Sequence, residues 1–316
     1  MKGSLKLDNN KNSNVIVAHG LTKTYDQVSV VNNLEMNVHE GDIYGFVGKN
    51  GAGKSTTMKM ICGLISPSSG SLTVLGNDPT KVKSKTSVGA LIEAPGILDN
   101  LSALDNMMHK SIALQVENPK EESMKLLELV GLANTGSKSA KAFSLGMKQR
   151  LGIALALVGN PKLLLLDEPF NGLDPAVTHE MRETLQKLNR EKGITIIVSS
   201  HILDQLNRFA TRFGVINAGQ MVVEFESERM AEMASGQIRV QCSEMKKAKK
   251  ALEKAFGEDK ISKTDDGAIS LPGSDIDTKQ VSDVLYEEKL QITELVQTKR
   301  DVEEFFLDLM SEKKDN

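Results

Sequence analysis

The sequence predicts an α/β protein with a parallel β-sheet, followed by a small α+β domain. Three short, continuous apolar runs are typical of strands buried on both faces: Ile43–Val47, Leu163–Leu166 and Ile194–Val198. Segments with a helical pattern separate these runs, and strands that alternate with helices favour a parallel sheet. The composition changes near residue 230, which predicts a second domain, and 316 residues accommodate two domains.

The composition is that of a globular protein. Hydrophobic residues make up 40% of the chain and charged residues 26%, which excludes a disordered, collagenous or disulfide-scaffold chain. The formal net charge of −3 provides no basic excess, so we expect no nucleic-acid partner. Cys62 and Cys242 lie far apart in the sequence, which fits a reducing compartment in which thiols need no bridge.

The sequence gives no sign of a membrane span. The longest apolar runs, Ile153–Val158 and Leu163–Leu166, are far shorter than the ~18–20 residues that a spanning helix needs. Residues 1–14 are polar and lack the apolar segment of a signal peptide. We therefore expect a soluble chain, to which other subunits would supply any membrane part.

The elements of the first domain can be followed in chain order. After the polar lead at residues 1–14, strands are expected at Val15–Val17, Leu34–Val38, Ile43–Val47 and Ser71–Leu75. Helices are expected from Ser55, over most of residues 100–160 and over Val177–Lys192. Gly131 and Asn134 mark breaks in the longest of these helical segments.

The region after Gly236 predicts the order strand, helix, two strands, helix, strand, helix. The strands at its two ends are expected at Ile238–Gln241 and Ile292–Val296, and a hairpin is expected around residues 265–267. The last helix has an apolar stripe and a capping box, formed by Val302, Phe305, Phe306, Leu309 and Met310 with Asp301 and Glu304. This order within about 80 residues predicts a small α+β sandwich.

A glycine-rich segment after the first buried strand has the pattern of a phosphate-binding loop. Gly48–Ser55 fits G-x-x-x-x-G-K-[ST] in full, between a strand and a helix. Its backbone N–H groups and the helix N-terminus would face phosphate oxygens, Lys54 would reach the β- and γ-phosphates, and the Ser55 hydroxyl would bind Mg²⁺. We expect nucleotide contacts from Gly48, Asn50, Gly51, Ala52, Gly53, Lys54, Ser55 and Thr56.

Two carboxylates follow the second buried strand. Asp167 would hold Mg²⁺ in its second shell. Glu168, one residue later, would face the other way around the strand end and polarise the attacking water as general base. Together with the glycine-rich loop, these carboxylates predict a P-loop nucleotide hydrolase.

Three further segments and one tyrosine narrow this class. Phe143–Arg150 opens a helix, Asn171–Asp174 follows the two carboxylates, and Ser199–His201 follows a strand. They resemble the signature motif, the D-loop and the switch histidine of the ATP-binding cassette (ABC) ATPases. Tyr25 matches the aromatic residue that stacks on adenine in that family. The resemblance covers residues 15 to about 225 in the family's order.

The resemblance implies an architecture and a set of roles. The ABC ATPase domain would span residues 15–228, with a RecA-like core, an antiparallel β-subdomain and a helical subdomain at about 95–160, and the α+β domain would span 237–316. Ser144 and Gly146 lie at a helix N-terminus and would offer donors to a phosphate. In the family such residues, with Asp174, serve the ATP of a second subunit, which implies a homodimer closed by ATP. His201 would donate to the γ-phosphate and orient the water with Glu168.

Two positions depart from the family's pattern. Leu145 stands where the signature motif has a glycine, and Glu93 stands where the Q-loop has its glutamine. A carboxylate at position 93 can ligate Mg²⁺ and take part in catalysis, but it cannot donate a hydrogen bond when ionised.

The segments around this second departure resemble one subgroup. Gly89–Gly96 and Asn100–Asn106 are similar to ATPases of lantibiotic self-immunity exporters, where a Glu replaces the Q-loop Gln, and to the bacitracin-resistance type. The resemblance implies an ATPase on the inner face of the cell membrane. It would drive separate permease subunits, which alone would contact the exported peptide antibiotic. Glu93 and the loop through Asp105 would receive the permease's coupling helix.

Other classes of ABC ATPase compete with this interpretation. A non-transport ABC ATPase would need two cassettes or a long coiled coil, whereas this chain has one P-loop and about 90 residues between Lys54 and Ser144. The ATPase of a multidrug, lipid or polysaccharide exporter stays open, because the permeases hold the substrate contacts. The role of the C-terminal domain also stays open; its last helix serves either core packing or a partner.

Overall fold

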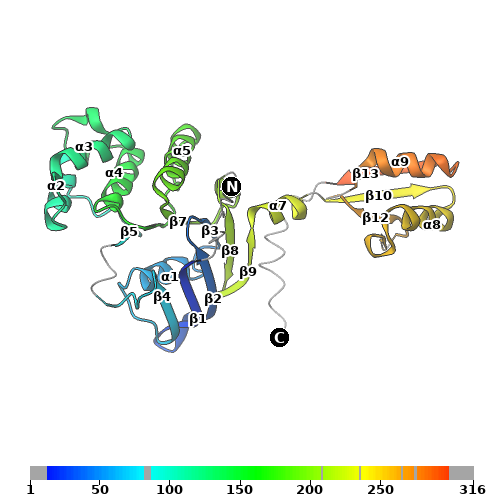
Figure 1. Cartoon of the computed structure of the whole chain (residues 1–316), viewed down its shortest axis with the longest axis horizontal. Helices are drawn as coiled ribbons and strands as arrows, with labels where there is room; N and C mark the ends of the chain where they lie inside the picture. The colour runs from blue at the N-terminus through cyan, green and yellow to red at the C-terminus, as the bar shows by residue number, and fades with distance from the viewer. Residues whose placement is uncertain are drawn as a thin grey trace, which may run out of the picture. The chain divides into compact units, whose positions relative to one another are not determined.

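The parallel sheet that the apolar runs predict lies at the centre of the chain's first unit (Figure 1). The computed structural model describes residues 13–81, 87–207, 209–234, 236–264, 266–273 and 276–298. The chain divides into two compact units, Met1–Glu224 and Phe225–Asn316. The first twelve residues and the predicted last helix, with Val302 and Phe306, lie outside the described residues.

Within the described residues, six strands form the central sheet in the order β5-β6-β7-β3-β8-β9. They are Ile43–Val47 (β3), Val88–Leu91 (β5), Leu163–Leu166 (β6), Thr195–Ser200 (β7), Arg212–Asn217 (β8) and Gln220–Glu226 (β9). Every residue of β3, β6 and β7 is buried, as expected of strands covered on both faces. The five strands from β5 to β8 pair in parallel, so their carboxyl ends meet at one edge, where open α/β sheets bind ligands.

A second sheet is antiparallel, with the strand order β2-β1-β4. Its strands are Asn14–Tyr25 (β1), Val28–His39 (β2) and Ser69–Val74 (β4). Inward side chains such as Ile16 and Leu34 share one apolar cluster with Phe46 of β3 and Met58 of α1 (Lys54–Ile61). This shared core fixes the antiparallel sheet against the strand and helix that flank the glycine-rich loop.

The first two strands are much longer than the sequence predicts. Continuous apolar runs mark only Val15–Val17 and Leu34–Val38, whereas the pairing continues to Tyr25 and Val28, with Leu21 and Val31 buried among half-exposed and exposed residues. The extension combines backbone hydrogen bonding between strands that share a tight turn with isolated buried side chains, which form no continuous apolar run.

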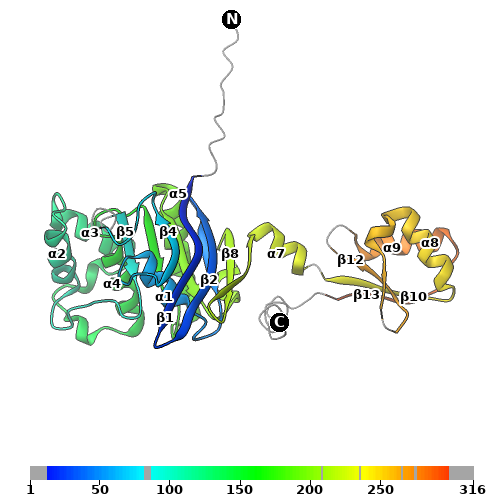
Figure 2. The ribbon, with the colours of Figure 1, turned by 90° about the horizontal axis from the view of Figure 1, so that it is seen from below.

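Helices make up most of the rest of the first unit (Figures 1 and 2). They are α2 (Ala103–Ala113), α3 (Pro119–Leu129), α4 (Leu145–Leu157), α5 (Pro175–Lys192), the short α6 (Asp204–Asn207), and the 3₁₀ turns Ala133–Thr135 (η2) and Ala140–Ala142 (η3). Helices α2, α3 and α4 pack against one another, and α4 also packs on β5. The segment predicted as helical from about 100 to 160 is therefore a three-helix cluster. Both predicted breaks fall between α3 and α4: Gly131 takes a φ of +71°, and Asn134 is non-helical within η2.

The second unit begins with the end of β9 and α7 (Ser227–Ala234). It then follows the predicted order through β10 (Gln237–Cys242), α8 (Met245–Phe256), η4 (Glu258–Lys260), β11 (Ser262–Lys263), β12 (Ile269–Pro272), α9 (Thr278–Glu287) and β13 (Ile292–Thr298). The strands form an antiparallel sheet in the order β11-β12-β10-β13. Ile238 and Val240 of β10 pack with Leu252 of α8 and Leu285 of α9. Since these strand residues alternate, both helices cover the same face of the sheet.

The other face of this small sheet carries a charged contact. Arg239 of β10 donates through Nε to Glu294 of β13 at 3.0 Å and through both terminal nitrogens to Asp266. The fork geometry of a guanidinium suits such paired contacts, and the hydrogen bond from Arg239 lowers the pKa of Asp266. The contact ties β13 and the β11–β12 turn to the central strand.

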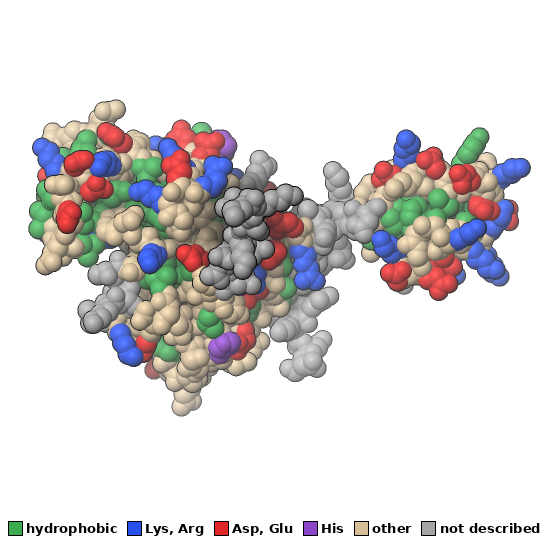
Figure 3. Space-filling view, in the orientation of Figure 1, with side chains coloured by type: hydrophobic (Ala, Val, Ile, Leu, Met, Phe, Trp, Pro, Cys, Tyr) green, Lys and Arg blue, Asp and Glu red, His purple; other side chains and the backbone are tan. Residues whose placement is uncertain are grey.

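Charges of both signs are mixed over the surface. On the face drawn in Figure 3, Lys and Arg side chains are interspersed with Asp and Glu over both units. Among the helices that the structure describes, none is long and apolar enough to cross a membrane.

A buried tyrosine connects the middle of the central sheet to its last strand. The Tyr44 hydroxyl of β3 donates to Oε1 of Glu224 in β9 at 2.6 Å. Gly214 of β8 leaves the space for this side chain, because a Cβ there would lie 1.8 Å from the tyrosine oxygen. Burial raises the pKa of Glu224, and the hydrogen bond from Tyr44 partly offsets that rise. Because the pKa of Glu224 is raised in the folded state, the folded state holds this proton more tightly than the unfolded state does. The stability that this proton contributes is lost as the pH rises through the pKa of Glu224.

Replacing Tyr44 with Phe should destabilise the first unit by about 1–3 kcal/mol, because the half-buried Glu224 carboxylate loses one donor and keeps the Asn37 N–H. The loss should be larger at pH 8 than at pH 4, since the hydrogen bond favours the ionised carboxylate and its removal raises the pKa of Glu224 further. Denaturant unfolding at the two pH values measures both effects. Tyr286→Phe, at a tyrosine that is 82% exposed, is the matched control. An equal loss at both pH values would contradict this account.

Candidate active site

The glycine-rich loop between β3 and α1 surrounds a buried lysine amine. Lys54 is 5% exposed, and its Nζ donates to the carbonyl oxygens of Gly48 at 2.6 Å and Lys49 at 3.2 Å. Gly53 has a φ of +108°, and a Cβ there would lie 2.8 Å from the Val30 carbonyl, so only glycine fits. The loop thus concentrates a cation and the N-terminus of α1 in one place, which suits an anion such as phosphate.

The loop's serine meets a carboxylate from β6. Ser55 Oγ donates to Oδ2 of Asp167 at 2.6 Å, and Ser199 Oγ of β7 donates to Oδ1 of Asp167 at 2.6 Å. Ser199 is fully buried, so its hydroxyl holds one oxygen of the carboxylate while the other faces Ser55. Hydroxyl and carboxylate oxygens are the donors that Mg²⁺ prefers.

The next carboxylate, that of Glu168, lies between the Lys54 ammonium and the His201 imidazole. Its Oε1 is 3.3 Å from Nζ of Lys54, and its Oε2 is 2.9 Å from Nδ1 of His201. Oε1 is buried and makes no hydrogen bond to the described residues, so it retains capacity for a further donor. The carboxylate therefore has one oxygen held by the histidine and one available beside the loop.

The backbone of Glu168 is strained. Its φ is +48°, a left-handed conformation that costs a non-glycine residue about 1–3 kcal/mol. Its N–H donates to Ser199 Oγ at 2.9 Å, so one buried hydroxyl contacts both Asp167 and Glu168. Strain of this kind concentrates at functional sites, where the surrounding contacts hold it.

Residues after β7 fix the histidine beside the loop. The Gly48 N–H donates to the Ser200 carbonyl at 3.2 Å, which ties the glycine-rich loop to the end of β7. Ser200 Oγ donates to Gln205 at 2.9 Å and accepts from the Ile202 N–H at 3.0 Å. These bonds shape the turn that carries His201 toward Glu168.

Four further site residues that the sequence predicts lie at the starts of α4 and α5 and at the end of β1. Ser144 caps α4 by accepting from the Met147 N–H at 3.3 Å, and Asp174 caps α5 by accepting from the Val177 N–H at 2.9 Å. Gly146 lies in the first turn of α4. Tyr25, 46% exposed at the end of β1, has the Lys23 ammonium 5.0 Å from its ring centroid.

The two positions that depart from the family's pattern have well-defined neighbours. Leu145, 53% exposed, lies over the Asn171–Asp174 turn, where a Cβ at Gly172 would be 2.9 Å from Leu145 Cδ2. Glu93 follows β5 and pairs with Lys59 of α1 at 2.5 Å. In this structure Glu93 therefore contacts the helix of the glycine-rich loop, one turn beyond Ser55.

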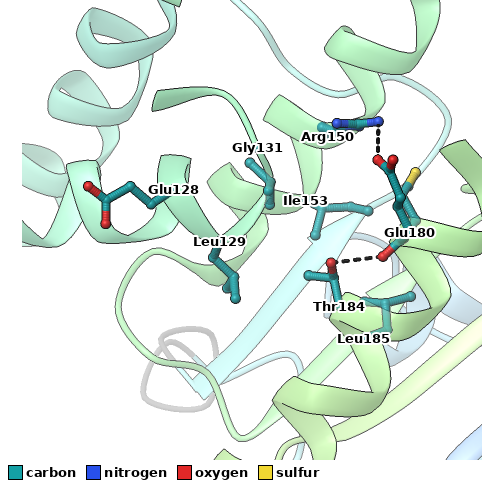
Figure 4. Close-up of a pocket in the computed structure, with 10 residues that line it drawn as sticks. Glu128, Leu129, Gly131, Arg150, Ile153, Glu180, Thr184 and Leu185 are labelled. Atoms are coloured by element: carbon teal, nitrogen blue, oxygen red, sulfur yellow. Dashed lines mark hydrogen bonds and ion pairs between the residues drawn. The ribbon is translucent and has the colours of Figure 1, made fainter. Parts of the chain in front are cut away.

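A cavity of about 170 Å³ lies away from this cluster, between the end of α3 and helices α4 and α5 (Figure 4). Leu129, Ile153 and Leu185 contribute apolar walls, and Arg150 pairs with Glu180 at 2.8 Å beside it. None of the predicted site residues lines this cavity. The Arg150–Glu180 ion pair joins α4 to α5, the helices that Ser144 and Asp174 cap.

Sequence reasoning missed one buried residue of the cluster. Ser199 entered only as part of the Ser199–His201 segment, whereas its hydroxyl contacts both carboxylates. A signal was available: β7 ends in two serines inside an otherwise apolar run, and a hydroxyl at the end of a buried parallel strand must find a partner.

Comparisons with known proteins agree on one family. The sequence profile of the ABC transporter family matches residues 31–171. The bacitracin transport ATP-binding protein BcrA of Bacillus licheniformis is 36% identical over 302 residues, which cover 94% of this chain and 98% of that protein. The lantibiotic transport ATP-binding protein SrtF of Streptococcus pyogenes is 42% identical over 221 residues, which cover 69% of this chain and 95% of that protein.

Solved structures give the same result for the fold. The dimeric structure of MJ0796, a bacterial ABC transporter cassette, matches with a TM-score of 0.62 and 26% identity, covering 67% of this chain and 98% of that one. The structure of an ATP-binding subunit of an ABC transporter matches with a TM-score of 0.62 and 27% identity, covering 69% of this chain and 92% of that one.

Replacing Ser199 with Ala should lower kcat for ATP hydrolysis by about tenfold to a hundredfold, because hydrogen bonds to charged groups contribute ~1.5–3 kcal/mol. The substitution removes the hydrogen bond that orients Asp167 and the hydrogen bond that holds the strained backbone of Glu168. ATP affinity should change much less, since neither bond contacts the loop lysine. Steady-state hydrolysis and nucleotide binding measure the two quantities.

Thr195→Val provides the matched control for this substitution. It removes a buried hydroxyl from the other end of the same strand, where Thr195 Oγ1 accepts from the Gly41 N–H and bonds to neither carboxylate. Equal losses of kcat in the two variants would show that Ser199 acts only through the packing of β7.

Proposed function

The chain belongs to the ABC transporter family and is an ATPase, and we propose that it powers export of a membrane-active peptide antibiotic through separate permease subunits. The observation that carries the ATPase part is the cluster of Lys54, Asp167, Glu168 and His201 at one edge of the central sheet. The substrate class is supported by relatives named for bacitracin and lantibiotic transport, the first of which aligns with 94% of this chain.

ATP binding would use the glycine-rich loop. Lys54 would exchange its carbonyl partners for the β- and γ-phosphates, to which N–H groups of the loop and of the first turn of α1 would also donate. Tyr25 is exposed and offers a face of its ring to the adenine. The Lys23 ammonium already makes a cation–π contact with this ring.

A divalent cation fits beside the phosphates. Ser55 and Asp167 supply two hard oxygen donors that already contact each other, and Glu93 is a third predicted ligand. Among the described residues, no three His, Cys, Asp or Glu side chains cluster as ligands, so phosphate oxygens and water would complete the shell. When bound, Mg²⁺ would neutralise charge on the β- and γ-phosphates.

Hydrolysis requires a base at the γ-phosphate. Glu168 has a buried oxygen with free acceptor capacity and would take the proton of the attacking water. His201 holds the other oxygen at 2.9 Å and would donate to the γ-phosphate, which fixes the carboxylate between water and histidine. The strained backbone of Glu168 aims its side chain before substrate arrives, which lowers the cost of positioning it.

A second copy of the chain would complete each nucleotide site. Ser144 and Asp174 cap their own helices, and the N-terminus of α4 keeps N–H groups that can face the phosphates of a partner's ATP. The solved cassette MJ0796 is dimeric. Leu145 packs on the Gly172 turn, so we propose that the signature segment and the D-loop approach the partner as one unit.

The permease contact would form at a groove between the parallel sheet and the helical cluster. This groove, of about 530 Å³, is lined by residues that follow α1 and by segments from β5, α2 and α4. Exposed Leu64 and Leu98 lie on its wall, and the turn after Glu93 contributes Ala94 and Pro95. An apolar groove beside a loop that reaches the nucleotide site suits a short coupling helix. The chain would then work at the cytoplasmic face of the membrane.

The substrate assignment is tested in the organism that carries this chain. Deleting its gene should lower the minimal inhibitory concentration of bacitracin or of a lantibiotic several-fold, because export would stop. Complementation with the wild-type gene should restore resistance, and Glu168→Gln should not, since it keeps nucleotide binding but lacks the base. Tyr286→Phe, at an exposed tyrosine of the second unit, should behave as wild type.

The outcomes separate the rival exporters. Unchanged sensitivity to both antibiotic classes after deletion would contradict peptide export and leave another exporter substrate. Full resistance with Glu168→Gln would contradict the dependence of export on hydrolysis at this site.

A further inference from the structure

Glu93 lies at the centre of a strained turn. Its φ is +62°, and the Ala94 N–H donates to the Ile92 carbonyl at 2.8 Å. A three-residue turn with a positive φ at its centre is the rarer and strained form of the γ-turn. A glutamate gains nothing by itself from this conformation, so a contact of its side chain or backbone must hold it there.

The described residues supply that contact in Lys59. The Lys59 ammonium of α1 lies 2.5 Å from Oε1 of Glu93. The lysine side chain is 29% exposed and the glutamate side chain 62%, so the pair is half-screened by water. Lys59 is four residues beyond Ser55, which places the pair about one helical turn, ~5.4 Å, from the Ser55 level of α1.

The turn also contacts the helix that begins at Ser144. Gly152 of α4 has no side chain, and a Cβ there would lie 2.6 Å from the Cβ of Pro95. The segment after β5 is thus fastened to α1 by an ion pair and packed against α4 by a proline. Movement of this turn would be transmitted to both helices.

The ion pair and the strain act in opposite directions. An ion pair this exposed contributes little: it changes an equilibrium constant about two- to fivefold. The strain of a left-handed non-glycine residue is at least comparable. The ion pair therefore does not offset the strain alone and acts together with the packing of Pro95 on Gly152, so a modest contact can shift the turn between two arrangements.

We propose that Lys59 is a positioning residue for Glu93: its ammonium holds the strained turn closed on α1 and limits how readily the Glu93 carboxylate reaches the nucleotide site. The proposal rests on the proposed ATPase role of Glu93. It identifies a residue through which occupation of the groove beside Pro95 is communicated to α1.

Amide hydrogen exchange of the full chain without nucleotide tests the positioning directly. In Lys59→Met, exchange of the peptide that covers residues 92–96 should be about two- to fivefold faster than in the wild type. Lys59→Arg should exchange as the wild type does, because the charge is kept. The double reversal Lys59→Glu with Glu93→Lys should restore slow exchange, because the pair re-forms with opposite polarity.

The chain offers a matched control in another ion pair to the same segment. Lys148 pairs with Asp99 at 3.0 Å, with side chains 30% and 56% exposed. Lys148→Met should leave exchange at residues 92–96 unchanged. Wild-type exchange in Lys59→Met, or equal acceleration in Lys148→Met, would overturn the proposal.

A magnesium titration of ATP hydrolysis separates positioning from general loosening. Because Glu93 is released in Lys59→Met, this variant should reach its half-maximal rate at a Mg²⁺ concentration about two- to fivefold lower than the wild type needs. Its kcat should change by a smaller factor than this Mg²⁺ concentration does. An unchanged magnesium requirement with faster exchange would overturn the link to the nucleotide site. Exchange is measured without substrate or permease, so a failure of the export assignment would leave its result intact.

Discussion

The register of three buried parallel strands brings together the residues that meet at the nucleotide site. Val47 of β3 pairs with Ser200 of β7, and Leu166 of β6 pairs with Val198. This register brings the glycine-rich loop, the two carboxylates and the histidine to one edge of the sheet. A shift by one residue would turn each side chain to the opposite face, and Asp167 would no longer meet Ser55. All three strands are fully buried, so packing on both faces fixes the register.

Electrostatics then shape what the register brings together. Lys54 is a buried cation with Glu168 beside it, and His201 contacts the same carboxylate from the other side. The strained backbone of Glu168 is held by Ser199, which also orients Asp167. These charges suit a phosphate group, and we propose that Lys54 exchanges an internal partner for that ligand. Because the strain is already present before binding, less reorganisation is needed during the reaction.

The sequence predicted those parts of the fold that depend on apolar patterning. The strands Ile43–Val47 and Leu163–Leu166 have the predicted bounds, and the second unit follows the predicted order through β13. The lengths of β1 and β2 were not predicted, because backbone pairing extends them through segments in which the buried Leu21 and Val31 are isolated among more exposed residues. At the site, the motif positions were readable from spacing, and their assigned roles stay predictions. The left-handed backbone of Glu168 and the Lys59–Glu93 pair depend on contacts between residues distant in the sequence, which a pattern does not contain.

The central claim is that Glu168 is the base of an ATPase built at this edge of the sheet. Single-turnover hydrolysis by purified Glu168→Gln measures it, with nucleotide binding and oligomeric state followed in parallel, and with Glu128→Gln, at an exposed glutamate of α3, as control. We predict that Glu168→Gln binds ATP, hydrolyses it about 10²- to 10⁴-fold more slowly and accumulates as an ATP-bound dimer, while the control turns over normally. Turnover of Glu168→Gln at the wild-type rate would contradict the assignment.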